Sequence, residues 1–543
     1  MVKLRDRTFL AVNVIFLAVF LPVLCGTLFV GNSMDYWVGM KLTVLLPGQV
    51  LALLALLGMA ACICLFRACR KMELTGKKNL VVNLILAALF IVLYFVNVRV
   101  AREIAFKLPW DIMVVRGAAY SVAYEEELGY YYYLSMYSNN IPISYILGKI
   151  LRKAMEMKNY PYVAEFMWLQ VNCILISLGG FFSCLTVKKL TGRLMPTVTA
   201  FGLYLVLVGI SPWKIAPYTD TYGMVFPIMG IYFYVCYKKA EKDLFRYLYL
   251  VPAMISIVAG GLVKPSIYVV LIALLAIEFL SFLADRKKYW KFFLTEVLLA
   301  AALLFAVNMC KDYFIEEIGL EFNPEIEAGW QNYLYMGLNE KTTGGYNGDD
   351  VAIFGEFQTS REERNQAALE RAFGRLKDRG FFGSVYFWLK KMMMTFNDGT
   401  FGWRSEVWVE EYFPDDLASN TALTQWLRDI FWVDAANMGR YNTLCQLAWY
   451  FCITGIPGIC LCKKEKREKY GVLALSFLGI FFYQMLFEAR ARYLLVFLPV
   501  LTAISICGIC QYTARVTEFL EKRKTGRTDR EAEHGAGNPA AEK

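Results

Sequence analysis

The chain contains about twelve apolar segments, each long enough to cross a lipid bilayer. A transmembrane helix needs about 20 predominantly apolar residues, with a range of about 17–25. Of the 543 residues, 57% are hydrophobic and only 19% are charged, which is far too apolar for a soluble protein of this length. The sequence therefore predicts an all-α polytopic membrane protein. We place the spans at residues 9–31, 43–66, 79–98, 165–187, 195–211, 220–237, 245–263, 267–284, 291–309, 443–462, 470–487 and 493–512.

Short basic tracts follow every second apolar segment. They read RACRK, KKLTGR, YKKAEK, ADRKKYWK and CKKEKREK. Because lysine and arginine concentrate in cytoplasmic loops, this alternation predicts a multi-pass cell-membrane protein with both termini in the cytoplasm. The tracts also account for the net charge of +10, so we expect no nucleic-acid partner.

The same threading predicts two large external loops, at residues 99–165 and 310–441. In the first, residues 143–155 are apolar on one face and basic on the other, which is typical of a helix in the membrane interface. In the second, Ser360 and Glu363 form a capping-box pattern before a helix that Gly380 ends. We expect an extra two-span region at 1–78, a core at 79–512 and a disordered cytoplasmic tail at 513–543.

Two acidic residues fall where apolar segments emerge on the external side. Asp111 follows Pro109 and Trp110, and Asp220 lies in the motif PYTDTY. A carboxylate held at such a position can act as a general base toward an acceptor hydroxyl. Aspartate also caps helices, so each residue has a purely structural alternative.

Four more ionisable residues are predicted to lie at the same external ends of the apolar segments. Lys264 lies between two apolar runs, and the segment FEARARY carries Glu488, Arg490 and Arg492. Ionisable groups at membrane depth mark functional sites by default, and arginine and lysine bind phosphate oxygens. The alternatives are a lysine that snorkels to the interface and arginine–glutamate pairs that fix helix ends.

A turn in the first external loop carries further candidates. Tyr137, Asn139 and Asn140 precede Pro142, which is suited to opening a helix. We expect these residues to position the polar groups of a substrate, unless they only form the turn.

Several kinds of chemistry are disfavoured. The single histidine, His534, lies in the polar tail, and the cysteines fall in or beside apolar segments. The segment GGYNGDD does not form a phosphate-binding loop. Its Asp349 and Asp350 could coordinate a hard cation, although a solvated turn is the simpler interpretation. We predict no metal site and no cofactor.

The layout of these motifs resembles the GT-C superfamily of integral-membrane glycosyltransferases, which use polyprenyl-phosphate sugars. The similarity rests on an aspartate in the first large external loop, a Tyr-x-Asn-Asn turn, a second external aspartate motif and an Arg-x-Arg-Tyr segment before the last span. The bacterial protein O-mannosyltransferase and aminoarabinose-transferase-like branch is the most similar. The resemblance implies that Asp111 is catalytic and that Asp220 is the second acidic residue.

The expected activity is an inverting transfer of a sugar from a polyprenyl-phosphate donor to an acceptor hydroxyl outside the membrane. Its partners would be that donor, membrane lipids and a protein, glycan or lipid acceptor. We expect Lys264, Arg490 and Arg492 to hold the lipid phosphate. The alternatives are a transporter or flippase of a lipid-linked precursor and an O-antigen-ligase-like enzyme. Clustering of the charged residues favours an enzyme, whereas pseudo-repeated halves favour a transporter.

Overall fold

The computed structural model describes residues 2–30, 43–158, 161–413, 418–433, 435–464 and 467–535. Among them, ten helices are long and apolar enough to cross a membrane. The prediction of an all-α polytopic membrane protein is confirmed. The ten helices are α1 (Val2–Cys25), α2 (Gly48–Ala68), α3 (Gly76–Ile104), α7 (Pro161–Thr191), α11 (Asp243–Val263), α12 (Tyr268–Ala284), α13 (Arg286–Glu317), α20 (Met438–Gly455), α21 (Arg467–Leu486) and α22 (Leu498–Gly535).

Two of the twelve predicted spans form shorter helices. The segment predicted at 195–211 forms α8 (Leu194–Tyr204), followed by one π-helical turn to Gly209. The segment predicted at 220–237 is divided by a turn into α9 (Thr219–Tyr222) and α10 (Val225–Lys239). Both segments pack against α7, so protein contacts supply much of their apolar surroundings.

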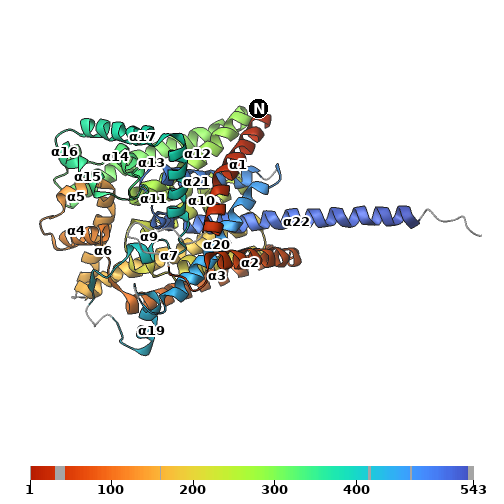
Figure 1. The fold of residues 1–543 in the computed structure, drawn as a ribbon, viewed down its shortest axis with the longest axis horizontal. Helices are drawn as coiled ribbons and strands as arrows, with labels where there is room; N and C mark the ends of the chain where they lie inside the picture. The colour runs from red at the N-terminus through yellow and green to blue at the C-terminus, as the bar shows by residue number, and fades with distance from the viewer. Residues whose placement is uncertain are drawn as a thin grey trace, which may run out of the picture.

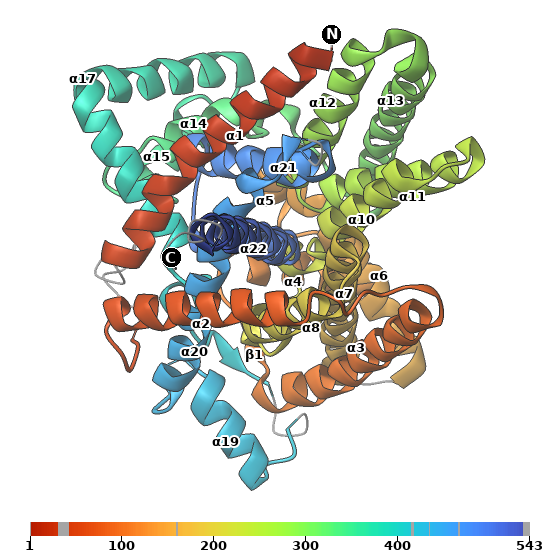
Figure 2. The same cartoon turned by 90° about the vertical axis from the view of Figure 1, so that its right-hand side faces the viewer.

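Helix α22 forms the centre of the bundle. In its apolar stretch 89% of the residues are buried, against 22% in α3 and 17% in α13. Figure 2 shows α22 end-on, with α1, α2, α7, α20 and α21 around it. The peripheral helices α3 and α13 therefore present most of their apolar surface outward, as expected of helices that face lipid.

A close helix crossing fixes α22 against α20. A Cβ atom at Gly508 would lie 2.0 Å from the carbonyl oxygen of Gly455, so only glycine fits at this crossing. Small residues allow such backbone approach between transmembrane helices, where apolar side chains gain little by leaving lipid. This contact fixes α20 and α22 relative to each other.

The two long loops form a cap at one end of the bundle, which we call the lid end. Figure 1 shows α4, α5 and α14–α16 at this end, while the last turns of α22 project from the opposite end. A two-stranded antiparallel sheet joins the loops, because β1 (Phe106–Lys107) pairs with β2 (Glu411–Tyr412). The helices of the loops are α4 (Asp111–Tyr124), α5 (Tyr131–Met136), α6 (Ile141–Lys158), α14 (Trp330–Gly337), α15 (Gly348–Val351), α16 (Ile353–Glu356), α17 (Arg361–Phe396), α18 (Trp403–Glu406) and α19 (Ala422–Phe431).

Helix α17 begins where the sequence predicts, but at Gly380 it bends and continues to Phe396 instead of ending. The Ser360 hydroxyl accepts a hydrogen bond from the backbone N–H of Glu363, which confirms the N-cap. At Gly380, φ is 65°, a value that glycine adopts without steric cost, and the helical axis kinks there. Beyond the kink, Phe381 and Phe382 are exposed, as expected of an aromatic surface beside a membrane.

Helix α6 differs from the predicted interfacial helix in what covers its apolar face. Ile143, Leu147 and Leu151 are buried, and α6 packs against α4, α7 and α13. On its polar side Lys149 pairs with Glu317 of α13 at 2.9 Å. The amphipathic pattern therefore reflects packing on neighbouring helices, which the sequence alone does not distinguish from packing on lipid.

The tail prediction fails over at least residues 513–523, because α22 continues as a helix through them to Gly535. This part of α22 is held by contacts with other segments. Arg515 donates to the carbonyl of Leu461 at 2.8 Å, and Glu521 pairs with Arg70 at 2.7 Å. Residues 536–543 lie outside the described residues.

Candidate functional site

Asp111 stands at the start of α4 but does not cap it. The N-cap residue is Trp110, whose φ of 55° is rare for a non-glycine residue, and no side chain caps this helix. Strained backbone of this kind persists where the surrounding structure enforces it and is common at active sites. Helix capping is therefore excluded as the role of the Asp111 carboxylate. Its hydrogen-bond partners lie on other segments.

Two tyrosines hold the Asp111 carboxylate. The Tyr133 hydroxyl donates to Oδ1 at 2.6 Å, and the Tyr218 hydroxyl lies 3.4 Å from Oδ2. Burial raises the pKa of both phenols, and the nearby Asp111 charge raises them further. Both tyrosines therefore stay neutral hydrogen-bond donors.

The predicted Tyr-x-Asn-Asn turn contacts this group. The amide of Asn140 donates to the Tyr133 hydroxyl at 2.8 Å and accepts from the Tyr218 hydroxyl at 3.1 Å. Asn139 donates to the Asn140 side chain at 3.3 Å, and the Tyr137 ring lies 5.1 Å from the Tyr133 ring. Asn140 thus orients both phenols, whereas no direct hydrogen bond joins Tyr137 or Asn139 to Asp111 among the described residues.

Beside Asp111 runs a series of six side chains of alternating charge, which we call the ion chain. Glu488 pairs with Arg490 at 3.5 Å, Arg490 with Glu406 at 3.3 Å, Glu406 with Arg492 at 3.4 Å, and Arg492 with Asp220 at 3.7 Å. Asp220 then pairs with Lys264. The six members are Glu488, Arg490, Glu406, Arg492, Asp220 and Lys264.

The ion chain joins segments that are distant in sequence. Asp220 belongs to α9, Lys264 follows α11, Glu406 ends α18, and Arg492 lies in the 3₁₀ turn Ala491–Phe497 after α21. Like Asp111, Asp220 makes no capping hydrogen bond. The ammonium of Lys264 also lies 4.8 Å from the centre of the Tyr493 ring, so this lysine is held within the protein and does not snorkel.

Arg492 is the most enclosed cation of the ion chain. Its side chain is 4% exposed, and the rings of Trp110 and Tyr218 lie 4.9 and 5.6 Å from the guanidinium. Its Nε and Nη1 have no hydrogen-bond partner among the described residues. Trp110 directly precedes Asp111, and the Tyr218 hydroxyl contacts the Asp111 carboxylate. Through these two residues the ion chain lies beside Asp111.

Glu406 is the functional candidate that the sequence did not reveal. It is buried and contacts both arginines, yet the segment FGWRSEVW has no motif that distinguishes this glutamate from the other acids of its loop. Burial alone would lower the pKa of Arg490, but the nearby carboxylates of Glu406 and Glu488 raise it. Glu406 therefore keeps two neighbouring guanidinium groups charged.

Lys391 fixes the lid to the end of α21. Its ammonium donates to the carbonyls of Gly337 and Phe487 at 2.5 and 2.6 Å and to that of Met485 at 3.1 Å. Burial lowers the pKa of Lys391 to about 7, and the Glu488 charge opposes this shift. Lys391 is fully buried, and these carbonyl groups surround its ammonium.

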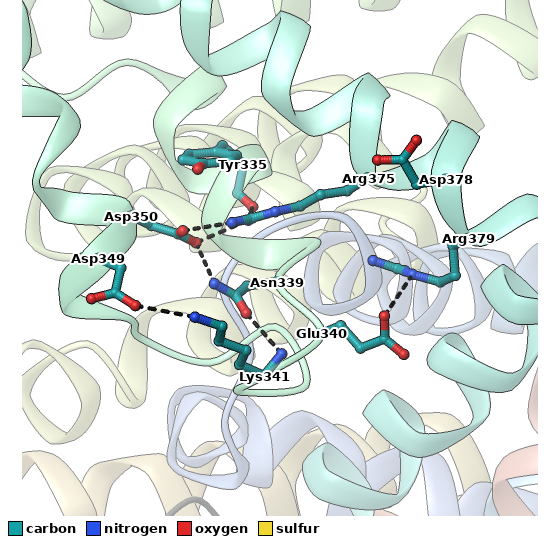
Figure 3. Close-up of a pocket in the computed structure, with 9 residues that line it drawn as sticks. All are labelled: Tyr335, Asn339, Glu340, Lys341, Asp349, Asp350, Arg375, Asp378 and Arg379. Carbon is teal, nitrogen blue, oxygen red and sulfur yellow. Dashed lines mark hydrogen bonds and ion pairs between the residues drawn. The ribbon is translucent and has the colours of Figure 1, made fainter.

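The acidic pair of the GGYNGDD segment has protein partners. Arg375 contacts both oxygens of Asp350 at 2.6 and 2.9 Å, and Asp349 pairs with Lys341 at 3.4 Å (Figure 3). In the described part of the chain, no group of three or more histidine, cysteine or acidic side chains has a metal-binding arrangement.

A second charged cluster lies at the end of the bundle opposite the lid. Lys238 bridges Glu278 and Glu468 at 2.9 and 3.2 Å, and the buried Glu296 has no hydrogen-bond partner among the described residues. Glu468 lies in the first turn of α21 and Glu488 follows its last turn, and at 20 residues α21 is about 30 Å long. The ionisable groups thus gather at two levels, whereas the sequence analysis identified only the lid end.

The model of one protein family matches residues 3–510 and carries the description "conserved hypothetical integral membrane protein". The chain belongs to this family. A search of curated proteins and a search of solved structures each found no match. Membership in this integral-membrane family agrees with the ten apolar helices, and the match includes the whole ion chain and Asp111.

We expect Glu406→Ala to destabilise the protein strongly. Removing this carboxylate leaves two buried guanidinium groups with one fewer counter-charge, and breaking a buried ion pair costs about 3–5 kcal/mol. The melting temperature of the detergent-purified protein measures the effect. Glu410→Ala, which removes an exposed acid of the same loop, is the control and should change stability by less than about 1 kcal/mol. Equal melting temperatures for the two variants would contradict the assigned role of Glu406.

Proposed function

We propose that this protein transfers a sugar from a polyprenyl-phosphate donor to an acceptor hydroxyl at the lid end. The observation that carries this proposal is the position of Asp111, an aspartate held by two phenols directly beside a buried ion chain. The resemblance to GT-C glycosyltransferases supports the same assignment. Clustering of Asp111, Asp220 and Arg490 at one end is what an enzyme of this class requires.

In the proposed reaction Asp111 acts as the general base. It accepts the proton of the acceptor hydroxyl while that oxygen attacks the anomeric carbon. The bond between this carbon and the phosphate oxygen breaks, and the polyprenyl phosphate leaves with the electron pair. A single displacement inverts the anomeric carbon. Tyr133 and Tyr218 hold the carboxylate in place, and Asn140 holds both phenols.

The ion chain would stabilise the departing phosphate. It contains three acids and three bases, so it is neutral, and a phosphate must compete with carboxylates for the cations. Lys264 and Arg490 are 14% and 12% exposed, against 4% for Arg492. We assign phosphate contact to Lys264 and Arg490, and we assign to Arg492 the structural role of holding Asp220 and Glu406. Fixed charges placed at a developing negative charge are an effective source of catalysis.

The proposal requires the lid end to face away from the cytoplasm. The basic tracts place the other end inside. A cysteine at Gly348, where a side chain meets open space, should react with an impermeant maleimide in intact cells. A cysteine at Lys464, whose side chain is 60% exposed at the other end, should react only after the cells are opened. The parent protein supplies the background from its own thiols. The reverse labelling pattern would refute both the orientation and the proposed reaction.

We expect Asp111→Asn to reduce turnover about 10²–10⁴-fold, the usual contribution of general-base catalysis. The amide keeps the size of the side chain and one acceptor oxygen, so the abundance and melting temperature should change little. The measurement is release of polyprenyl phosphate from a panel of polyprenyl-phosphate sugars. Asp312→Asn, at an exposed acid near the end of α13 and outside both proposed sites, is the matched control and should stay within twofold of the parent. Turnover of Asp111→Asn within a few-fold of the parent would remove Asp111 from catalysis.

Arg490→Lys tests phosphate contact. Lysine keeps the charge but loses the planar fork, so the affinity of the purified protein for undecaprenyl phosphate should fall about tenfold. Arg371→Lys, which alters an exposed pair with Glu356, should leave that affinity unchanged. A lowered melting temperature with unchanged affinity would assign Arg490 to structure and leave Lys264 as the phosphate ligand.

A further inference from the structure

A separate cavity opens in the lid, at the outer side of the second loop. Its volume is about 480 Å³, which is within the usual range for small-molecule sites. It is lined by residues of α14, of the loop that follows α14, of α15 and of α17, and Figure 3 shows the side chains of Asn339, Asp350 and Arg375 directed toward one another. None of these residues belongs to the ion chain or contacts Asp111, so the cavity is distinct from the proposed reaction site.

The base of the cavity is a rigid polar network. Asn339 and Asp350 are 3% and 4% exposed, and the amide of Asn339 donates to Asp350 at 2.8 Å. Arg375 contacts both oxygens of Asp350 and also donates to the carbonyl of Tyr335 at 2.6 Å. A site with fixed hydrogen-bonding groups loses little entropy when a ligand binds.

Arg379 supplies hydrogen-bond donors that the protein does not use. Its side chain is 5% exposed, and its Nη2 donates to the carbonyl of Leu338 at 2.6 Å. Its Nε and Nη1 have no hydrogen-bond partner among the described residues, and the nearest carboxylate, that of Glu340, is 3.9 Å from Nε. Buried donors without an acceptor are costly, so a ligand that offers acceptor oxygens would be stabilised here.

The charges of the lining disfavour a simple anion. The four carboxylates of Glu340, Asp349, Asp350 and Asp378 face the three cations of Lys341, Arg375 and Arg379. The formal net charge of the lining side chains is −1, so they repel a phosphate or carboxylate ligand. Hydroxyl groups both donate to carboxylates and accept from guanidinium groups, and they carry no charge. The lining thus suits a neutral polyhydroxylated molecule.

A short loop connects this cavity to the proposed reaction site. Asn339, Glu340 and Lys341 line the cavity, while Gly344 accepts a hydrogen bond at 3.0 Å from the backbone of Ala489, beside Arg490. Lys391 fixes both ends of this arrangement, because it bonds the carbonyls of Gly337 and Phe487. A molecule in the cavity is therefore held at a constant position relative to the ion chain.

We infer that the cavity lined by Asn339, Asp350 and Arg379 binds the neutral saccharide part of the acceptor. This assignment rests on the proposed function and narrows the acceptor from a protein, glycan or lipid to a molecule that carries sugar. The saccharide hydroxyls donate to the carboxylates of Glu340 and Asp378 and accept from Arg379. A neighbouring sugar then presents its hydroxyl to Asp111.

Saccharide binding is testable without any donor lipid. The full-length protein in detergent is titrated with maltotriose, mannotriose and chitotriose, and binding is followed by saturation-transfer NMR. We expect saturable binding of at least one trisaccharide. The combined change Glu340→Gln and Asp378→Asn should weaken that binding about tenfold, since two charge-assisted hydrogen bonds become neutral ones. Both acids are exposed, but Glu340 also pairs with the buried Arg379, so the melting temperature of the variant is compared with that of the parent before binding is measured.

A control variant and two anionic control ligands distinguish specific saccharide binding from other kinds of binding. Glu370→Gln alters an exposed acid of α17 outside the cavity and should bind as the parent does. Inorganic phosphate and glucuronate, tested in the same way, should bind more weakly than the best trisaccharide. Absence of trisaccharide binding, tighter binding of an anion, or equal binding by the Glu340/Asp378 variant would each overturn the inference. Saccharide binding that persists while no lipid-linked sugar is consumed would instead refute the proposed reaction alone.

Discussion

Compensation of buried charge is the constraint on which the lid end of this protein depends. Arg492 is enclosed by aromatic rings, and a guanidinium in such surroundings is stable only with nearby carboxylates. Asp220 and Glu406 supply them from two different segments, so the charge of Arg492 holds a helix of the core against a helix of the lid. The lid is therefore attached to the bundle by electrostatic contacts as well as by the small β1–β2 sheet.

Trp110 and Tyr218 contact the ion chain and also determine the position of Asp111. Trp110 stacks near Arg492 and precedes Asp111, and Tyr218 lies between Arg492 and Asp111 while preceding Asp220 by two residues. A displacement of one group would move the other, which links the position of the proposed base to that of the proposed phosphate ligands. Positioning of this kind is where enzymes obtain much of their rate acceleration.

With the cavity beside Arg379, we assign the long second loop a binding role in addition to covering the proposed reaction site. Loops of this length without a function are uncommon in compact domains. Here the loop builds a cavity from short helices, and Lys391 connects its base to the end of α21. The proposed donor site and the proposed saccharide site thus lie on one continuous support.

The sequence determined the membrane-spanning class, the start of α17 at Ser360 and the candidates Asp111, Asp220, Lys264 and Arg490, because hydropathy, caps and ionisable residues near membrane spans are local signals. It also marked Gly380, but as the end of a helix that bends there and continues to Phe396. Only the tertiary structure revealed Glu406, the alternating ion chain and the burial of Lys391. These depend on which side chains meet across hundreds of residues, and an acid in a polar loop has no local signal of its partner. The same reason explains α6, whose amphipathic pattern fits lipid and protein equally well.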